Sequence, residues 1–161
     1  MLIDRHRCNA VNARLHIAVY APSSPQRLVD MARLAFAFDF VKSFIVIKPT
    51  GMAAQVGLAD VSKMAYKLGK NLVILQSLNE LIEVLKTDRV FVLVHDPEAR
   101  SIEEVQIEGD VVIVIQGGEA PIPKQEAAIG EPIRIPLDYG ITIPVADEAI
   151  LLHVLATHRC K

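Results

Sequence analysis

The sequence predicts an α/β fold, with a mostly parallel sheet flanked by helices, and three observations support this. Short runs that are apolar at every position, such as residues 44–47 and 111–115, recur along the chain. Strands that are covered on both faces have this pattern. Helix-like stretches separate the runs and can serve as the crossover connections that parallel neighbours require. With 161 residues and no long linker, we expect one domain over residues 1–161.

The first half of the chain predicts three strand–helix units. Ser24 can cap a helix that begins at Pro25, a residue suited to the first helical position. Gly69 is placed to end the second helix in a left-handed conformation. Ser77, with Glu80 three residues later, matches a capping box for the third helix. The expected strands are residues 15–20, 44–47 and 72–75, and the expected helices are residues 25–38, 56–68 and 77–86.

The second half predicts two further strands, an extended piece and a closing helix. The extended piece is weaker because Pro132 and Pro136 interrupt it, and proline cannot donate to a strand ladder. A polar and acidic stretch in this half reads as a solvated excursion, and the polar N-terminal segment as a loose one. These assignments are strands at 90–94 and 111–115, the extended piece at 131–137, the helix at 145–157, the excursion at 96–110 and the N-terminal segment at 1–13.

Composition and charge limit the classes of function. The chain is 52% hydrophobic, which excludes a disordered protein. Its formal net charge of −2 argues against a strongly basic coat for nucleic acid. No apolar run approaches the roughly 20 residues that a membrane helix needs, so no membrane partner is expected. Cys8 and Cys160 lack CxxC spacing and no secretory signal opens the chain, which indicates a reducing, cytoplasmic location.

The carboxyl ends of parallel strands are where α/β proteins gather their ligands. Gly117 and Gly118 follow the most hydrophobic strand, where glycine permits either a close approach of the backbone to a ligand or simply a tight turn. They belong to neither a GxGxxG fingerprint nor a P-loop. The strand ends of interest are residues 20–22, 48–51, 95–97 and 116–119.

Three other features have both a functional and an ordinary interpretation. The stiff loop at residues 135–145 can hold an adenine edge at low ordering cost, or can be a rigid connector. Arg33 lies among apolar residues of the first helix and is either a functional cation or a surface arginine. His95 and Asp96 point to opposite faces of a strand, so we read them as a turn before Pro97 rather than an acid–base pair. No HExxH or paired CxxC motif predicts a metal site.

Three segments carry a resemblance to one family. Residues 24–39 hold Arg33, Ala35 and Phe38 at matching positions of a first motif. Residues 117–119 match a second motif, and residues 135–145 match a third. In this order they resemble the SpoU branch of the SPOUT superfamily of S-adenosylmethionine-dependent RNA methyltransferases, and in particular its small archaeal members. The chain departs from the motifs in several places: Asp39 adds a negative charge, Thr142 replaces a serine and Pro144 replaces an asparagine.

The resemblance implies a Rossmann-like sheet with a deep C-terminal trefoil knot, an S-adenosyl-L-methionine site and a homodimer. Arg33 would be the catalytic residue, a fixed cation that faces the cofactor across the dimer interface. The implied cofactor-binding residues are His95, Gly117, Gly118, Glu119, Ile135, Pro136, Leu137, Gly140, Thr142 and Ile143.

The function implied by the resemblance is methylation of RNA, either tRNA or rRNA, at a ribose 2′-hydroxyl. The alternative is a non-catalytic knotted dimer that binds RNA or a nucleotide. A hydrolytic nuclease has little support, because no metal-binding carboxylate cluster is evident. No basic–aromatic platform for RNA is visible along the chain. A modest basic patch is expected only if a dimer gathers Arg5, Arg7, Arg14, Arg27 and Lys42.

Overall fold

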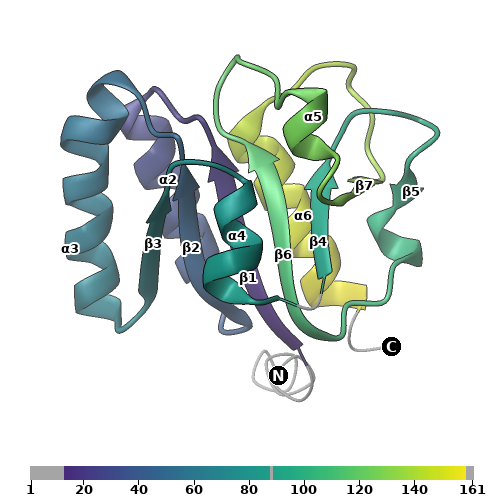
Figure 1. The fold of residues 1–161 in the computed structure, drawn as a ribbon. Coiled ribbons are helices and arrows are strands. Elements are labelled where there is room, and N and C mark those ends of the chain that lie inside the picture. Colours follow the sequence, from purple (N-terminus) through teal and green to yellow (C-terminus); the bar gives the residue numbers. More distant parts are fainter. Residues whose placement is uncertain (1–12, 88, 159–161) are drawn as a thin grey trace.

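One parallel sheet organises the protein. The computed structural model describes residues 13–87 and 89–158, and in this part of the chain every neighbouring pair of strands is parallel (Figure 1). The order is β3-β2-β1-β6-β4-β7-β5, so the predicted α/β class and parallel sheet are confirmed. The strands are β1 (Ala13–Tyr20), β2 (Val41–Ile47), β3 (Asn71–Leu75), β4 (Arg89–Leu93), β5 (Arg100–Ser101), β6 (Gly109–Gln116) and β7 (Glu131–Arg134).

Helices cover both faces of the sheet (Figure 1). Successive strand residues point to opposite faces, so Ile17 packs in the core on one side and Ala18 in the core on the other. The first face is covered by α2 (Pro25–Phe36), α3 (Leu58–Leu68) with the preceding π-helical turn η1 (Ala53–Gly57), and α6 (Pro144–His158). The second face is covered by α4 (Asn79–Leu85) and α5 (Lys124–Ala127). No helix among residues 13–87 and 89–158 is long and apolar enough to span a membrane.

Of the three helix ends predicted in the first half of the chain, the structure confirms two. The Ser24 hydroxyl accepts a hydrogen bond from the Arg27 amide at 3.3 Å, and Pro25 is the first residue of α2. Gly69 ends α3 with a φ of +65°. The capping box is wrong, because α4 begins at Asn79 and the Glu80 carboxylate instead accepts from the Gln76 amide at 3.0 Å.

Residues 96–110 are not simply a solvated excursion. They contain β5 and the short 3-10 helix η2 (Ile102–Glu104), and two apolar side chains from this stretch, Ile102 and Val105, are buried against α6 and the sheet. A two-residue strand and one turn of helix carry too little periodicity to stand out from a sequence rich in acidic residues. Of the predicted loose segment at residues 1–13, Ala13 instead begins β1, and residues 1–12 lie outside the described residues, as do both cysteines.

The insertion of β7 between β4 and β5 determines which loops meet. Ile133 pairs with Leu93 of β4 and with Arg100 of β5. Glu131 holds both neighbours by ion pairs, at 2.7 Å from Arg89 and 3.0 Å from Arg100. The chain reaches β7 from α5 on one face and leaves it for α6 on the other. The loops after β4 and β7 therefore lie side by side at the carboxyl edge of the sheet.

Candidate functional site

A cavity of about 260 Å³ opens where the loops after β4 and β7 meet. Residues 95–97 form one wall, and residues 134, 135, 137 and 138 form the other. Ile135 is buried, whereas Leu137 is 54% exposed and available to a bound molecule. The structure thus brings together His95, Ile135 and Leu137, three of the residues predicted to bind the cofactor.

His95 is held in this cavity by a buried acid. Its Nε2 lies 3.0 Å from Oδ2 of Asp147, which is in the first turns of α6 and is almost fully buried. The Tyr139 hydroxyl donates to the other oxygen of Asp147, and the rings of His95 and Tyr139 lie 5.3 Å apart. Asp147 therefore receives two side-chain donors, a pattern that fixes the orientation of the imidazole.

The polarity of these hydrogen bonds follows from their environment. Burial, and after it the hydrogen bond to Asp147, raises the pKa of Tyr139, so its hydroxyl stays protonated and donates. A carboxylate next to Nε2 places the proton of a neutral imidazole on that nitrogen. The Nδ1 atom of His95 then keeps a free lone pair that can accept a proton. Asp96, the neighbour in sequence, accepts from the Glu98 amide at 3.0 Å instead.

The two glycines that follow β6, Gly117 and Gly118, pack closely against the end of β1 and the loop after it. The Gly117 amide donates to the Tyr20 carbonyl at 2.7 Å. A Cβ atom on Gly117 would lie 2.4 Å from Cγ1 of Val19 and 2.8 Å from the Tyr20 carbonyl oxygen. A Cβ atom on Gly118 would lie 3.2 Å from the Ala21 carbonyl oxygen. At Gly117 the close contact with the end of β1 requires glycine, whether or not a ligand binds, whereas the contact at Gly118 is only tight.

The remaining predicted residues of the third motif lie on the loop that leads into α6. Gly140 has a φ of +75°, and its amide donates to the Asp138 carboxylate at 2.8 Å. The Ile143 carbonyl accepts from the Asp147 amide at 2.8 Å, which starts the hydrogen-bond pattern of the helix. Pro136 is exposed and Thr142 is half-buried. This loop therefore connects the cavity wall directly to the acid that holds His95.

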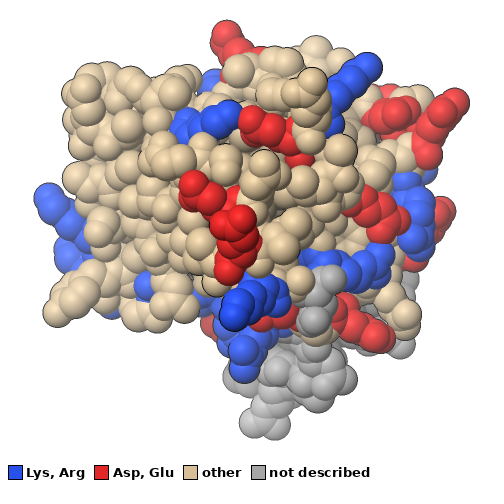
Figure 2. Space-filling model, viewed as in Figure 1, with Lys and Arg blue, Asp and Glu red and all other residues tan. Residues whose placement is uncertain are grey.

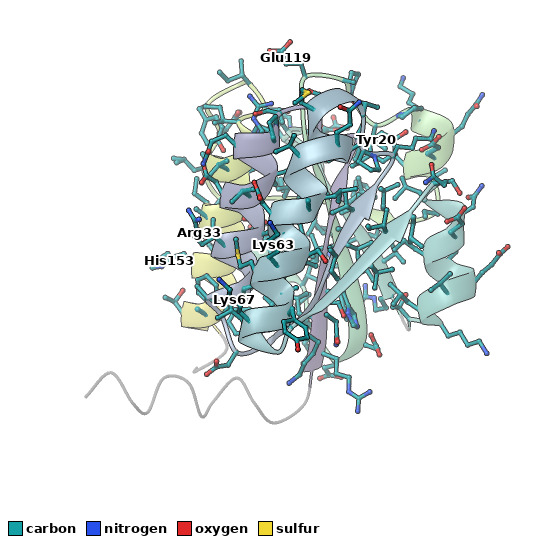
Figure 3. The ribbon with its side chains drawn as sticks, turned by 90° about the vertical axis from the view of Figure 1, so that its left-hand side faces the viewer. Tyr20, Arg33, Lys63, Lys67, Glu119 and His153 are labelled. Atoms are coloured by element: carbon teal, nitrogen blue, oxygen red, sulfur yellow. The ribbon has the colours of Figure 1, made fainter. Side chains whose placement is uncertain are left out.

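Arg33 does not line this cavity. It projects from the outer face of α2 into a separate groove between α2 and α3, with its side chain 67% exposed. Figure 3 places Glu119 at the carboxyl edge of the sheet and Arg33 farther along α2, away from that edge. Within one chain, the predicted catalytic residue and the predicted cofactor-binding residues are thus in two different places.

A second polar cluster lies at the carboxyl ends of β1 and β2. The Lys48 ammonium donates to the Glu126 carboxylate at 2.7 Å and to the Tyr20 hydroxyl at 3.4 Å. The hydrogen bond to Glu126 raises the pKa of Lys48, and the same bond lowers the pKa of Glu126. Ala21 and Lys48, which directly follow the two strands, both have φ near +50°, a conformation unusual for residues with a side chain. The cluster anchors the four-residue helix α5 to the sheet.

Sequence reasoning missed the supporting residues Tyr139 and Asp147. Their only local signal is Asp147 in the first turn of a mostly apolar closing helix, a position that ordinary helix-dipole effects also favour. Among the residues that the structure describes, no group of three or more His, Cys, Asp or Glu side chains is arranged to hold a metal ion.

Comparison with known proteins gives a family and a fold. Residues 51–154 match the model of the family described as RecB-family nuclease (DUF2122). A protein of Aeropyrum pernix named "Putative type II restriction enzyme ApeKORF2002P" is 34% identical over 136 residues, which cover 83% of this chain and 86% of that protein. The chain belongs to the DUF2122 family. Another relative of this DUF2122 protein, from Methanocaldococcus jannaschii and named "Putative type II restriction enzyme MjaORF1200P", is 36% identical over 50% of the chain and 54% of that protein.

The solved structures that this DUF2122 protein resembles are methyltransferases. The SpoU methyltransferase AviRb of Streptomyces viridochromogenes, crystallised with AdoMet, superimposes with a TM-score of 0.75 at 13% identity, over 98% of this chain and 64% of that one. A structure described as giving insight into 2-OH methylation of C/U34 on tRNA has a TM-score of 0.69 at 19% identity, over 88% of this chain and 93% of that one. The predicted SpoU resemblance is therefore confirmed as a likeness of fold.

Proposed function

We propose that this protein is an S-adenosylmethionine-dependent RNA methyltransferase that acts on a ribose 2′-hydroxyl of tRNA or rRNA in the cytoplasm. The observation that carries the proposal is the cavity at the carboxyl ends of β4 and β7, where His95, Ile135 and Leu137 meet. The fold shared with SpoU methyltransferases, one of them crystallised with AdoMet, supports the same conclusion.

The cavity suits the nucleoside part of the cofactor. Ligand pockets are typically about 300–1,000 Å³ and mostly apolar, with a few placed polar groups. The cavity, at about 260 Å³, is slightly smaller and combines Ile135 and Leu137 with the polar edge of His95. We infer that the amino-acid part extends towards Gly117, Gly118 and Glu119, because β6 is the direct neighbour of β4.

His95, which Asp147 orients, is the group that we assign to remove the proton of the acceptor in this cavity, which Asp96 and Asp138 also line. When bound, S-adenosylmethionine supplies an electrophilic methyl group on a sulfonium. Nδ1 of His95 would accept the proton of the ribose hydroxyl while the methyl–sulfur bond breaks and the methyl group passes to the oxygen, with S-adenosylhomocysteine as the leaving group, and Asp147 would stabilise the resulting imidazolium. Arg33 cannot accept this proton, because a guanidinium does not lose its own in proteins. Its role is to stabilise negative charge on the ribose oxygen, an effect worth on the order of 10²–10³ in rate.

Two features of assembly follow from this proposal. Arg33 lies outside the cavity of its own chain, so it can serve a bound cofactor only in a homodimer, by facing the cavity of the partner subunit. The C-terminal part forms a trefoil knot in which the chain after α5 passes through the loop made by β4, β5 and β6. The insertion of β7 between β4 and β5, with α5 and α6 on opposite faces, supports this path.

Isothermal calorimetry with S-adenosylmethionine tests the cofactor site. We expect micromolar binding, weakened at least 10-fold in Leu137→Asp, because a carboxylate would be placed against an apolar part of the ligand. Ile82→Asp is the matched control, since Ile82 is 51% exposed and lies on α4, across the sheet. Silence at millimolar cofactor would overturn the methyltransferase proposal, and RNA binding that persisted would favour the non-catalytic binder. A crystal with bound cofactor would test the same site and trace the proposed knot.

A second candidate function is cleavage of nucleic acid, which the names of the family and its relatives favour. It predicts Mg²⁺-dependent nicking of plasmid DNA that does not require S-adenosylmethionine. Transfer of a labelled methyl group to RNA, followed by alkaline hydrolysis, separates the two candidates. A methylated 2′-hydroxyl protects the adjacent phosphodiester, so the label would be recovered in an alkali-resistant dinucleotide.

A further inference from the structure

Three basic side chains line one groove on the outer surface of the helix layer. The groove has a volume of about 680 Å³ and lies between α2 and α3, which pack against each other. Arg33 reaches it from α2, and Lys63 and Lys67 reach it from α3 (Figure 3). Val29 and Met64 add apolar surface to the same groove. It therefore combines positive charge with an apolar lining.

The positive charge of the groove is largely uncompensated. Lys63 and Lys67 are exposed and form no ion pair within the described part of the chain. Arg33 lies 3.8 Å from Asp30, a solvent-exposed pair one helical turn apart that contributes little. Asp60 also lines the groove, so three cations face one acid there.

Three basic residues elsewhere, Lys48, Arg89 and Arg100, are paired with carboxylates. Lys48 is paired with Glu126 at 2.7 Å, and Glu131 binds two arginines at the β7 edge. On the face covered by α4 and α5, basic and acidic side chains are interspersed (Figure 2). The α2–α3 groove is thus distinguished by three cations that line one cavity, in a chain whose formal net charge is −2.

An exposed aromatic ring neighbours Lys63 and Lys67 on α3, outside the lining of the groove itself. Tyr66 is 90% exposed, follows Lys63 by three residues and immediately precedes Lys67 on α3. Residues three or four apart on a helix are neighbours, about 5–6 Å between Cβ atoms. Proteins that bind single-stranded nucleic acid combine cations along the backbone with aromatic rings on which bases stack. A basic–aromatic surface is therefore present, although none was visible along the sequence.

We propose that the α2–α3 groove binds a single-stranded segment of RNA, with Lys63 and Lys67 contacting phosphates and Tyr66 stacking on a base, while Arg33 at the same groove keeps its role at the ribose oxygen. This inference rests on the proposed function, because it assigns the path of the RNA substrate. Stacking on Tyr66 needs a base that is not paired and stacked within a duplex, which favours a single strand. An acidic peptide would satisfy the cations but would leave Tyr66 without a planar partner.

Fluorescence anisotropy with a labelled single-stranded RNA of about 12 nucleotides, measured over a salt series, tests the groove. In Lys63→Gln/Lys67→Gln, the slope of log affinity against log salt should become shallower by about 1.4, because two phosphate contacts are lost. Tyr66→Ala should bind about 5- to 150-fold more weakly with an unchanged slope, because stacking releases no counterions. Lys124→Gln, on α5 across the sheet, is the matched control and should bind as the wild type does. Asp60→Asn should bind more tightly.

The outcomes separate this inference from the proposed function. If RNA binding depends on Lys63, Tyr66 and Lys67 while calorimetry finds no S-adenosylmethionine binding, the groove assignment stands and the methyltransferase proposal fails. If the cofactor binds but all the groove variants bind RNA with the same affinity as the wild type, the groove assignment is overturned. Equal competition by duplex DNA with the same variant sensitivity would also overturn it. So would variants that change the oligomeric state in light scattering and leave RNA affinity intact.

Discussion

His95 and Asp147 are hydrogen-bonded at 3.0 Å although 52 residues separate them in the chain. One follows β4 and the other begins α6, and the insertion of β7 brings these two segments to the same cavity. A histidine held by a buried carboxylate at a ligand cavity is the common arrangement of a general base.

The first prediction concerns this pair. Asp147→Asn should lower the rate of methyl transfer roughly 10²-fold, because an amide can hold the imidazole in the wrong tautomer. Cofactor affinity should change only a few-fold, since Asp147 does not line the cavity. Single-turnover kinetics and calorimetry measure the two quantities separately. A variant that lost cofactor binding and kept its rate at saturation would assign His95 and Asp147 to binding alone.

The second prediction concerns the proposed sharing of one active site by two subunits. In homodimers Arg33→Ala should lower transfer by roughly 10²–10³-fold, and Leu137→Asp should lower it at least about 10-fold when S-adenosylmethionine is far below saturation, so each homodimer has little activity. Co-expression of the two chains should restore about a quarter of the wild-type activity, because half of the dimers are mixed and each mixed dimer has one intact site. If Arg33 acts within its own chain, the mixture stays inactive. Differently tagged chains allow the mixed dimers to be purified and assayed.

The third prediction concerns the glycines after β6. Gly117→Ala should lower the free energy of unfolding by roughly 1–3 kcal/mol, because the new methyl group would meet the backbone oxygen of Tyr20 and the side chain of Val19. Gly118→Ala should lower the free energy of unfolding by less than about 1 kcal/mol, because its methyl group would lie 3.2 Å from the nearest atom, which is close but not overlapping. Urea denaturation followed by circular dichroism compares them. Equal and small effects would contradict the steric explanation.

The fourth prediction concerns Glu148, which is fully buried in α6 and has two carboxylate oxygens without a hydrogen-bond partner in the described residues. Burial raises its pKa well above the ordinary value of 4.5. Above pH 4.5 the unfolded chain releases this proton while the native chain retains it, so this group favours unfolding increasingly as the pH rises.

At pH 4 the free energy of unfolding of Glu148→Gln should therefore equal that of the wild type. At pH 8 the variant should be more stable than the wild type by roughly 1–3 kcal/mol. The exposed Glu83→Gln on α4 is the control and should show no such divergence. Urea midpoints measured from pH 4 to pH 8 provide the comparison. A difference between Glu148→Gln and wild type that shrinks as the pH rises would contradict the assignment.

The sequence predicts the helices and strands of this fold better than it predicts the contacts between them. The Ser24 cap, the Gly69 stop and the continuous apolar strands are local signals, and the structure contains all of them. The strand β5 is two residues long and produces no such signal. Its pairing with β7 depends on contacts formed across the chain, which periodicity does not encode.

The candidate site was only partly predictable for the same reason. His95, Ile135 and Leu137 were chosen from strand ends and motif resemblance, and they do share one cavity. Asp147 could not be paired with His95 without the order of the strands. Lys63, Tyr66 and Lys67 are visible as helix residues, but which face of α3 stays uncovered depends on the packing of α2.

The position of β7 also determines the order in which parts of the fold can form during synthesis. β5 emerges from the ribosome about thirty residues before β7, the strand with which it pairs. Until residues 131–134 have emerged, β5 has no strand with which to pair. One wall of the cavity, formed by residues 134–138, is also missing until then. The pocket is therefore completed only after β7 has emerged, and we expect nascent chains that stop before residue 134 to be unable to retain a ligand.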